Sequence, residues 1–96
     1  MNTTTLVAHN ISEDLMKLAG YQVREDFDQH GYFTWVKVEN GVVTEGCDSS
    51  FESAAEAWDE VRLIMAEQME GEGLEADDWN ILTAEERHVS IRNIFH

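Results

Sequence analysis

The sequence predicts an α+β fold in which helices pack on one face of a three-stranded antiparallel sheet. Apolar residues recur at helical spacing near the N-terminus, at every second position from Tyr21, and at helical spacing again from Ala54. The dipeptide Asn40-Gly41 lies between two short apolar runs. A Ser-x-x-Glu sequence at 53–56 precedes the longest helical stretch. These observations place a sheet between two helical regions.

The chain length indicates one domain. With 96 residues, the chain is close to the usual size of a domain, and its core is too small to be divided in two. A hydrophobic content of 43% and nine aromatic residues are sufficient for such a core and argue against wholesale disorder. We therefore treat residues 1–96 as a single compact acidic domain.

The first predicted elements are a short helix and the start of the sheet. Residues 10–13 offer a helix N-cap followed by acidic residues, and Gly20 lies where a left-handed residue would end the helix. The alternation from Tyr21 to Phe27 predicts a first strand, and a second strand begins at Phe33.

A tight turn joins the second and third predicted strands. Asn40-Gly41 separates two valine-containing runs, and the mirror-image hairpin turn needs positive φ at both of its central residues. Asn and Gly accept this conformation more readily than other residues. The strands should therefore form an antiparallel meander.

A long helix is predicted after the sheet. Ser53 and Glu56 have the spacing of a capping box, and the apolar stripe that follows extends to about Met69. Two glycines, Gly71 and Gly73, then end the helix. We expect an acidic loop after it.

The last predicted element is a short C-terminal helix. Thr83 and Glu86 form a second capping box, and His88, Ile91 and Phe95 could line one helical face. Some of the apolar residues in this segment also fall at even spacing, so a terminal strand is the alternative.

The charge of the chain limits the classes of partner. Twenty acidic residues against six basic ones give a formal net charge of −14. Such a field repels nucleic acids and anionic membranes, and it attracts basic proteins. We expect no direct nucleic-acid binding and no membrane contact. The N-terminus has no basic region followed by an apolar run, which favours a cytoplasmic protein.

The acidic residues gather on one side of the long predicted helix. On a helical wheel of about 100° per residue, they lie within about 80° of Glu52, opposite the face that carries Trp58 and Met65. Only Arg62 interrupts them, although like-charged neighbours destabilise a helix. An apolar anchor could come from this face or from the acidic loop. The candidate partner-binding residues are Glu52, Glu56, Asp59, Glu60, Leu63, Glu67, Glu70, Asp77, Asp78 and Trp79.

The sequence carries no recognisable catalytic or metal-binding motif. The single cysteine, Cys47, excludes an internal disulfide framework, and a small half-buried strand residue is its simplest interpretation. The histidines His9, His30, His88 and His96 do not have the paired spacing of metal ligands. We expect no metal, no cofactor and no enzymatic activity.

Small size, strong acidity and the acidic helix together resemble the small phage and mobile-element inhibitors of the anti-CRISPR and anti-restriction DNA-mimic types. Residues 35–61 contain the passage Val43-Thr44-Glu45-Gly46 followed by Phe51-Glu52-Ser53-Ala54-Ala55-Glu56-Ala57. This region is similar to the strand-to-helix passage of HicB-type antitoxins. Both resemblances imply a protein that neutralises a basic partner.

The expected function is that of an acidic inhibitor that occupies the basic nucleic-acid-binding surface of a partner, such as a CRISPR effector or a restriction nuclease. Three alternatives stay open: a HicB-like toxin-neutralising antitoxin fragment, a small hydrolase or metal-dependent enzyme, and a housekeeping domain whose charge serves solubility. The sequence leaves the oligomeric state undetermined, with a homodimer among the alternatives.

Overall fold

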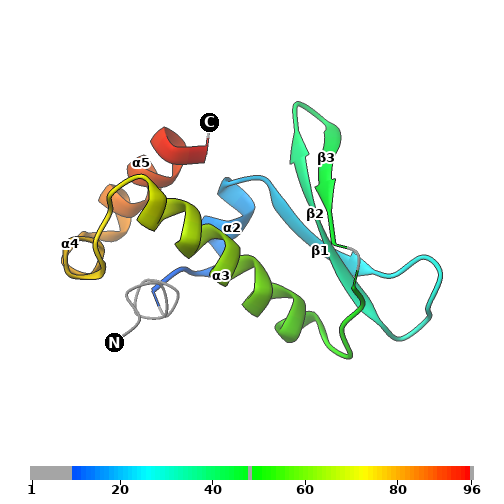
Figure 1. Ribbon diagram of the computed structural model, residues 1–96. Helices are drawn as coiled ribbons and strands as arrows, with labels where there is room; N and C mark the ends of the chain where they lie inside the picture. The colour runs from blue at the N-terminus through cyan, green and yellow to red at the C-terminus, as the bar shows by residue number, and fades with distance from the viewer. Residues whose placement is uncertain (1–9, 48, 96) are drawn as a thin grey trace.

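The computed structural model describes residues 10–47 and 49–95, and it confirms the α+β class. A three-stranded sheet and four helices make up the described chain (Figure 1). In chain order they are α2 (Glu13–Leu18), β1 (Tyr21–Glu25), β2 (Phe33–Glu39), β3 (Val42–Gly46), α3 (Ala54–Gly71), α4 (Ala76–Asn80) and α5 (Ala84–Phe95).

The sheet is the predicted antiparallel meander, in the order β1-β2-β3. Asn40 has φ 52° and Gly41 has φ 80°, as the mirror-image turn requires. A register irregularity between Lys37 and Val38 interrupts the pairing with β3. A bridge between Phe33 and Phe51 attaches the segment that leads from β3 to α3.

The first strand is shorter than predicted, and Phe27 is not part of it. The strand ends at Glu25, and the Asp26 N–H then donates to the Tyr32 carbonyl at 2.8 Å. The Asp28 N–H donates to the Asp26 carboxylate at 2.9 Å, which turns the chain locally. Phe27 therefore lies in the connecting turn with 97% of its surface exposed.

The N-terminal helix begins and ends as predicted. The Ser12 hydroxyl accepts the Leu15 N–H at 3.3 Å, and Gly20 follows the helix with φ 107°. A Cβ atom at Gly20 would lie 2.6 Å from the Val38 carbonyl oxygen. Only glycine can therefore turn the chain here while the backbone of β2 passes so closely.

The long helix has one half of its predicted capping box. The Ser53 hydroxyl accepts the Glu56 N–H at 3.2 Å. The Glu56 carboxylate accepts the N–H of Glu52 rather than that of Ser53, at 3.3 Å, so the predicted reciprocal bond is displaced by one residue.

A Schellman turn ends the long helix. Gly73 has φ 88°, and its N–H donates to the Glu70 carbonyl at 3.0 Å. The next N–H, that of Leu74, donates to the Met69 carbonyl at 3.1 Å. The chain reverses direction and enters α4, a five-residue helix within the segment that was predicted to be an acidic loop.

The C-terminal element is a helix, and the strand alternative is wrong. Its capping box is reciprocal, because the Glu86 N–H donates to the Thr83 hydroxyl at 3.2 Å and the Thr83 N–H donates to the Glu86 carboxylate at 2.9 Å. Hydrogen bonding of the Glu86 carboxylate to the Thr83 backbone N–H, and then to the Thr83 side chain, lowers the pKa of Glu86 below its ordinary value. No helix of the described residues is long and apolar enough to cross a membrane.

The core lies between the sheet and the helices. Figure 1 shows α2 and α3 on one side of the sheet, and α5 packs against α2. Tyr21 and Trp35 meet edge to face at 5.6 Å between ring centroids, on the sheet face that the helices cover. The largest fully buried side chains are those of Trp79, Tyr21, Ile11, Met16, Met65, Met69, Ile91 and Val61.

Candidate protein-binding site

Five of the predicted contact residues lie exposed on α3. Four are acidic, and the fifth, Leu63, is an apolar residue with 46% of its surface exposed. We call the four acids the acidic ridge: Glu56, Asp59, Glu67 and Glu70. From its first member to its last, the ridge extends about 21 Å along the helix axis, at about 1.5 Å per residue.

The acidic ridge faces solvent, and the residues next to it add little positive charge. Trp58 and Met65 occupy the buried face of α3 and direct the opposite face to solvent. Glu52 is exposed just before the helix begins, so it lies beside the ridge but outside α3. Since the last turn of α3 contains no basic residue, the ridge stays acidic to its end.

Arg62 is the only basic residue of α3, and the fold already uses its guanidinium group. Nη1 lies 2.6 Å from an Asp59 carboxylate oxygen, and Nε donates to the Ile11 carbonyl at 2.8 Å. The pair reduces the negative charge at Asp59. No other residue of α3 is basic.

The structure removes Glu60 from the ridge. Its side chain is half-buried, and one carboxylate oxygen accepts the Trp35 indole N–H at 2.6 Å. The same oxygen lies 3.2 Å from the Cys47 sulfur atom. Glu60 is on the flank of α3 that faces β2, so this carboxylate satisfies a buried donor instead of facing a partner.

The expectation that Trp79 is exposed in a loop is wrong. Its side chain is fully buried, and the indole N–H donates to the Asn10 carbonyl at 3.2 Å. The Arg87 guanidinium group lies 5.4 Å from the indole ring centre. Trp79 therefore joins α4 to the N-terminal segment and to α5, and a partner could reach it only if the core opened.

The two other residues predicted in this segment are exposed. Asp77 and Asp78 lie in the first turn of α4. They belong to a different helix from the ridge, beyond the turn at Gly73. The structure thus divides the candidate surface into a long acidic helix and a short acidic one.

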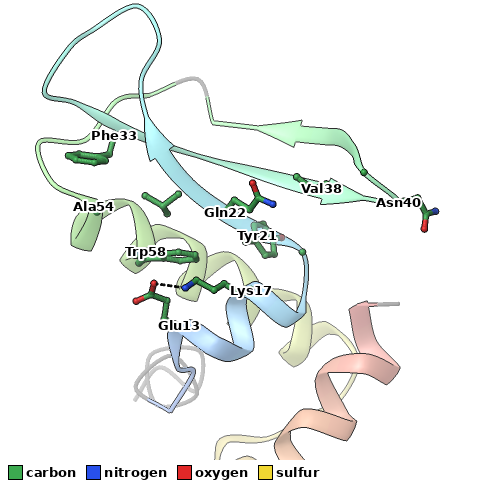
Figure 2. A pocket seen from close by; sticks show the side chains of 12 residues that line it. Glu13, Lys17, Tyr21, Gln22, Phe33, Val38, Asn40, Ala54 and Trp58 are labelled. Atoms are coloured by element: carbon green, nitrogen blue, oxygen red, sulfur yellow. Dashed lines mark ion pairs between the residues drawn. The ribbon is translucent and has the colours of Figure 1, made fainter.

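A groove along the free edge of β1 was not predicted. It has a volume of about 590 Å³, and Figure 2 shows that its lining residues come from β1, from the β2–β3 hairpin and from the helices α2 and α3. Lys17 and Glu13 form an ion pair of 3.2 Å on the helical side of the groove. The meander order alone implies that β1 is an edge strand, but only the tertiary packing shows that helices line it.

Two acidic residues of β2 and β3 add negative electrostatic potential at the edge strand β1. Burial, together with the nearby carboxylates of Glu45 and Glu39, raises the pKa of Tyr21 to about 12. Lys37 offsets part of this charge, because its ammonium nitrogen lies 3.4 Å from Glu39 and 5.6 Å from the Tyr21 ring centre.

Cys47 and His30 each contact a carboxylate. The Cys47 thiol donates to the Glu60 carboxylate at 3.2 Å, and its sulfur atom accepts the Ser49 N–H at 3.3 Å. His30 is exposed and contacts Glu25 at 2.9 Å, while His9 and His96 lie outside the described residues. Within the described residues, no group of three or more His, Cys, Asp or Glu side chains could hold a metal ion.

Comparisons of the chain with protein-family models, with curated proteins and with solved structures found no match.

Proposed function

We propose that this protein is an acidic inhibitor that binds the basic nucleic-acid-binding surface of a partner protein, such as a CRISPR effector or a restriction nuclease. The acidic ridge is the observation that carries the proposal. It places exposed carboxylates along about 21 Å of one rigid helix, without a lysine among them. Carboxylates one to several helical turns apart present the partner with a row of negative charge comparable in scale to a phosphate backbone.

The contact surface consists of the ridge together with its exposed neighbours. Glu52 extends the row at one end, and Asp77 and Asp78 add negative charge on α4. Leu63 lies among the ridge acids and supplies an apolar contact in the centre. Glu60 and Trp79 have internal roles and are not part of this surface.

The proposal can be tested by reversing charge at chosen positions. In the ridge variant, lysine replaces two residues of the acidic ridge, Glu67 and Glu70, and the neighbouring Glu52. In the matched control, the exposed acids Asp14, Asp28 and Glu85 are replaced in the same way, which gives the same net charge. Basic nucleic-acid-binding proteins are captured from a nuclease-rich lysate at two salt concentrations, and each is then tested for competition between the acidic protein and DNA.

The ridge variant should bind a captured protein about tenfold more weakly than the control, since three exposed ion pairs of roughly 0.5 kcal/mol each sum to that factor. Binding should also weaken as salt rises. Equal losses in the two variants would show that net charge alone matters. Simultaneous binding of the acidic protein and DNA would contradict the proposal directly.

A further inference from the structure

The free edge of β1 presents backbone groups that can pair with another strand. On the β2 side, the Val38 N–H donates to the Gly20 carbonyl and the Asp26 N–H donates to the Tyr32 carbonyl, both at 2.8 Å. In an antiparallel ladder the direction of these groups alternates, so the N–H and C=O groups of residues 21, 23 and 25 point away from β2. β1 is at the edge of the sheet, and nothing in the described chain pairs along it there.

The surroundings of this edge form a bounded groove. Trp58 and Phe33 give it an apolar lining, Ala54 marks its end at the start of α3, and the ion pair of Lys17 with Glu13 lies on its other side (Figure 2). The other edge strand differs, because all five residues of β3 are exposed. Only β1 thus offers both open hydrogen-bonding groups and a wall against which side chains can pack.

The dimensions suit a short extended segment. Five residues in β conformation span about 17 Å, which is the length of β1. Alternate side chains of an added strand would lie on the same sheet face as Tyr21 and Val23, next to Trp58. This is the arrangement in which main-chain bonds supply affinity and alternate side chains supply specificity.

The charge distribution selects among possible occupants. A second copy of the chain would bring another net charge of −14 to the same edge. The lining itself contains one acid and one base, which are paired, whereas Glu45 and Glu39 add negative potential that is felt at Tyr21. A positively charged segment without its own helical layer is therefore favoured over a second copy.

We propose that the β1 groove binds an extended, basic segment of a partner protein, which adds to the sheet as a fourth strand. This surface is separate from the acidic ridge. The inference therefore goes beyond the inhibitory contact proposed above and does not depend on it.

The test uses the complete chain and a nine-residue peptide with valine at alternate positions and lysine between them. Two further peptides serve as probes: one is N-methylated at alternate amides, and one has glutamate in place of lysine. Amide chemical shifts of the protein are followed during titration. We expect saturable shifts centred on Tyr21, Val23 and Glu25, with small changes on β3.

The N-methylated peptide should bind at least about tenfold more weakly, since it loses two or more backbone hydrogen bonds of ordinary net strength. The glutamate peptide should give no saturable shifts. In the protein, Val23→Pro removes an outward N–H at an edge position, where proline is tolerated, and it should abolish the shifts. If this variant does not fold, the N-methylated peptide still decides the question.

Three results would overturn the proposal. Equal binding of the N-methylated peptide would exclude strand addition. Shifts confined to β3 or to α3 would place the site elsewhere. Self-association through β1 without peptide, detected by sedimentation, would identify a second copy as the occupant. The ridge variant should retain the peptide-induced shifts at β1. A result that contradicts the proposal for the acidic ridge can therefore be distinguished from one that contradicts the proposal for the β1 groove.

Discussion

Glu60 is a charged residue whose side chain stabilises the fold, because its carboxylate accepts a hydrogen bond from a buried tryptophan. Trp35 is 7% exposed, and its indole N–H would lack a partner without the Glu60 carboxylate. A buried donor left without an acceptor costs about 1–3 kcal/mol, which is more than most surface ion pairs contribute. The carboxylate is therefore worth more to stability than its neighbours on the ridge.

Replacing Glu60 by alanine should lower the free energy of unfolding by about 1–3 kcal/mol, because the Trp35 N–H then has no acceptor. Glu60→Gln keeps a carbonyl oxygen in place and should cost less than about 1 kcal/mol. Urea unfolding measures both, with Glu67→Ala as an exposed control that should change stability by less than about 0.5 kcal/mol. Equal stability of Glu60→Ala and Glu67→Ala would show that the Glu60 carboxylate does not stabilise the fold as the acceptor of the Trp35 N–H.

The helical wheel predicts the angular position of Glu60 but not its surroundings. It places this residue at the border of the acidic face, and the segment around Cys47 then covers that flank. Trp79 illustrates the same limit, since the acids beside it indicate a loop while its large apolar ring is buried against Asn10. Such contacts connect residues far apart in the chain, so local patterns do not contain them.

At the scale of the element, the junctions determine where helices and strands begin and end. Gly20 joins α2 to β1 at φ 107° with the Val38 carbonyl directly beside it. Gly31 also has positive φ, at 86°, but beyond its two chain neighbours no described heavy atom would lie within 4 Å of a Cβ atom at this position. A side chain at Gly31 would therefore meet backbone strain alone, whereas one at Gly20 would meet the same strain and a steric clash.

Gly20→Ala should destabilise the protein by about 3 kcal/mol, because it combines an unfavourable φ with a clash against backbone. Gly31→Ala should cost only about 1 kcal/mol, the strain of a left-handed residue alone. Chemical denaturation of both variants gives the comparison. Similar losses would mean that the Val38 carbonyl moves aside readily.

The elements that the sequence predicts correctly are those with a decisive local signal. The positive φ of Gly20, the Asn40-Gly41 turn and the Thr83 cap each depend on one or two residues. Helix α4 has no such signal, since Glu75 makes no side-chain capping bond. It is held by Trp79 in the core, and the β1 groove likewise exists only because helices pack beside the strand.

At the scale of the whole molecule, the net charge of −14 opposes folding, because the folded state brings the carboxylates closer together. The cations offset little of this, since pairs such as Lys17 with Glu13 are exposed and contribute little. Salt screens both the repulsion between carboxylates and the attraction within ion pairs. Because the repulsion is the larger of the two, added salt should stabilise the folded state.

Raising sodium chloride from 0.02 to 0.5 M, a range of roughly 20 to 4 Å in Debye length, should increase the free energy of unfolding by about 1 kcal/mol. This is the sum expected for a few like-charged neighbours on α3 at about 0.2–0.5 kcal/mol each. Thermal and urea unfolding at several salt concentrations provide the measurement. A protein that loses stability as salt rises would show that its ion pairs outweigh the repulsion.

The bonds at the N-terminal segment have a consequence for synthesis. The Ile11 carbonyl accepts from Arg62, 51 positions later, and the Asn10 carbonyl accepts from Trp79, 69 positions later. During translation, α2 is made before α3 and α5, two of the elements that pack against it in the folded protein. Helix α2, with its buried Leu15 and Met16, therefore cannot complete its packing until these later helices emerge, and part of its apolar face stays uncovered in the nascent polypeptide until then.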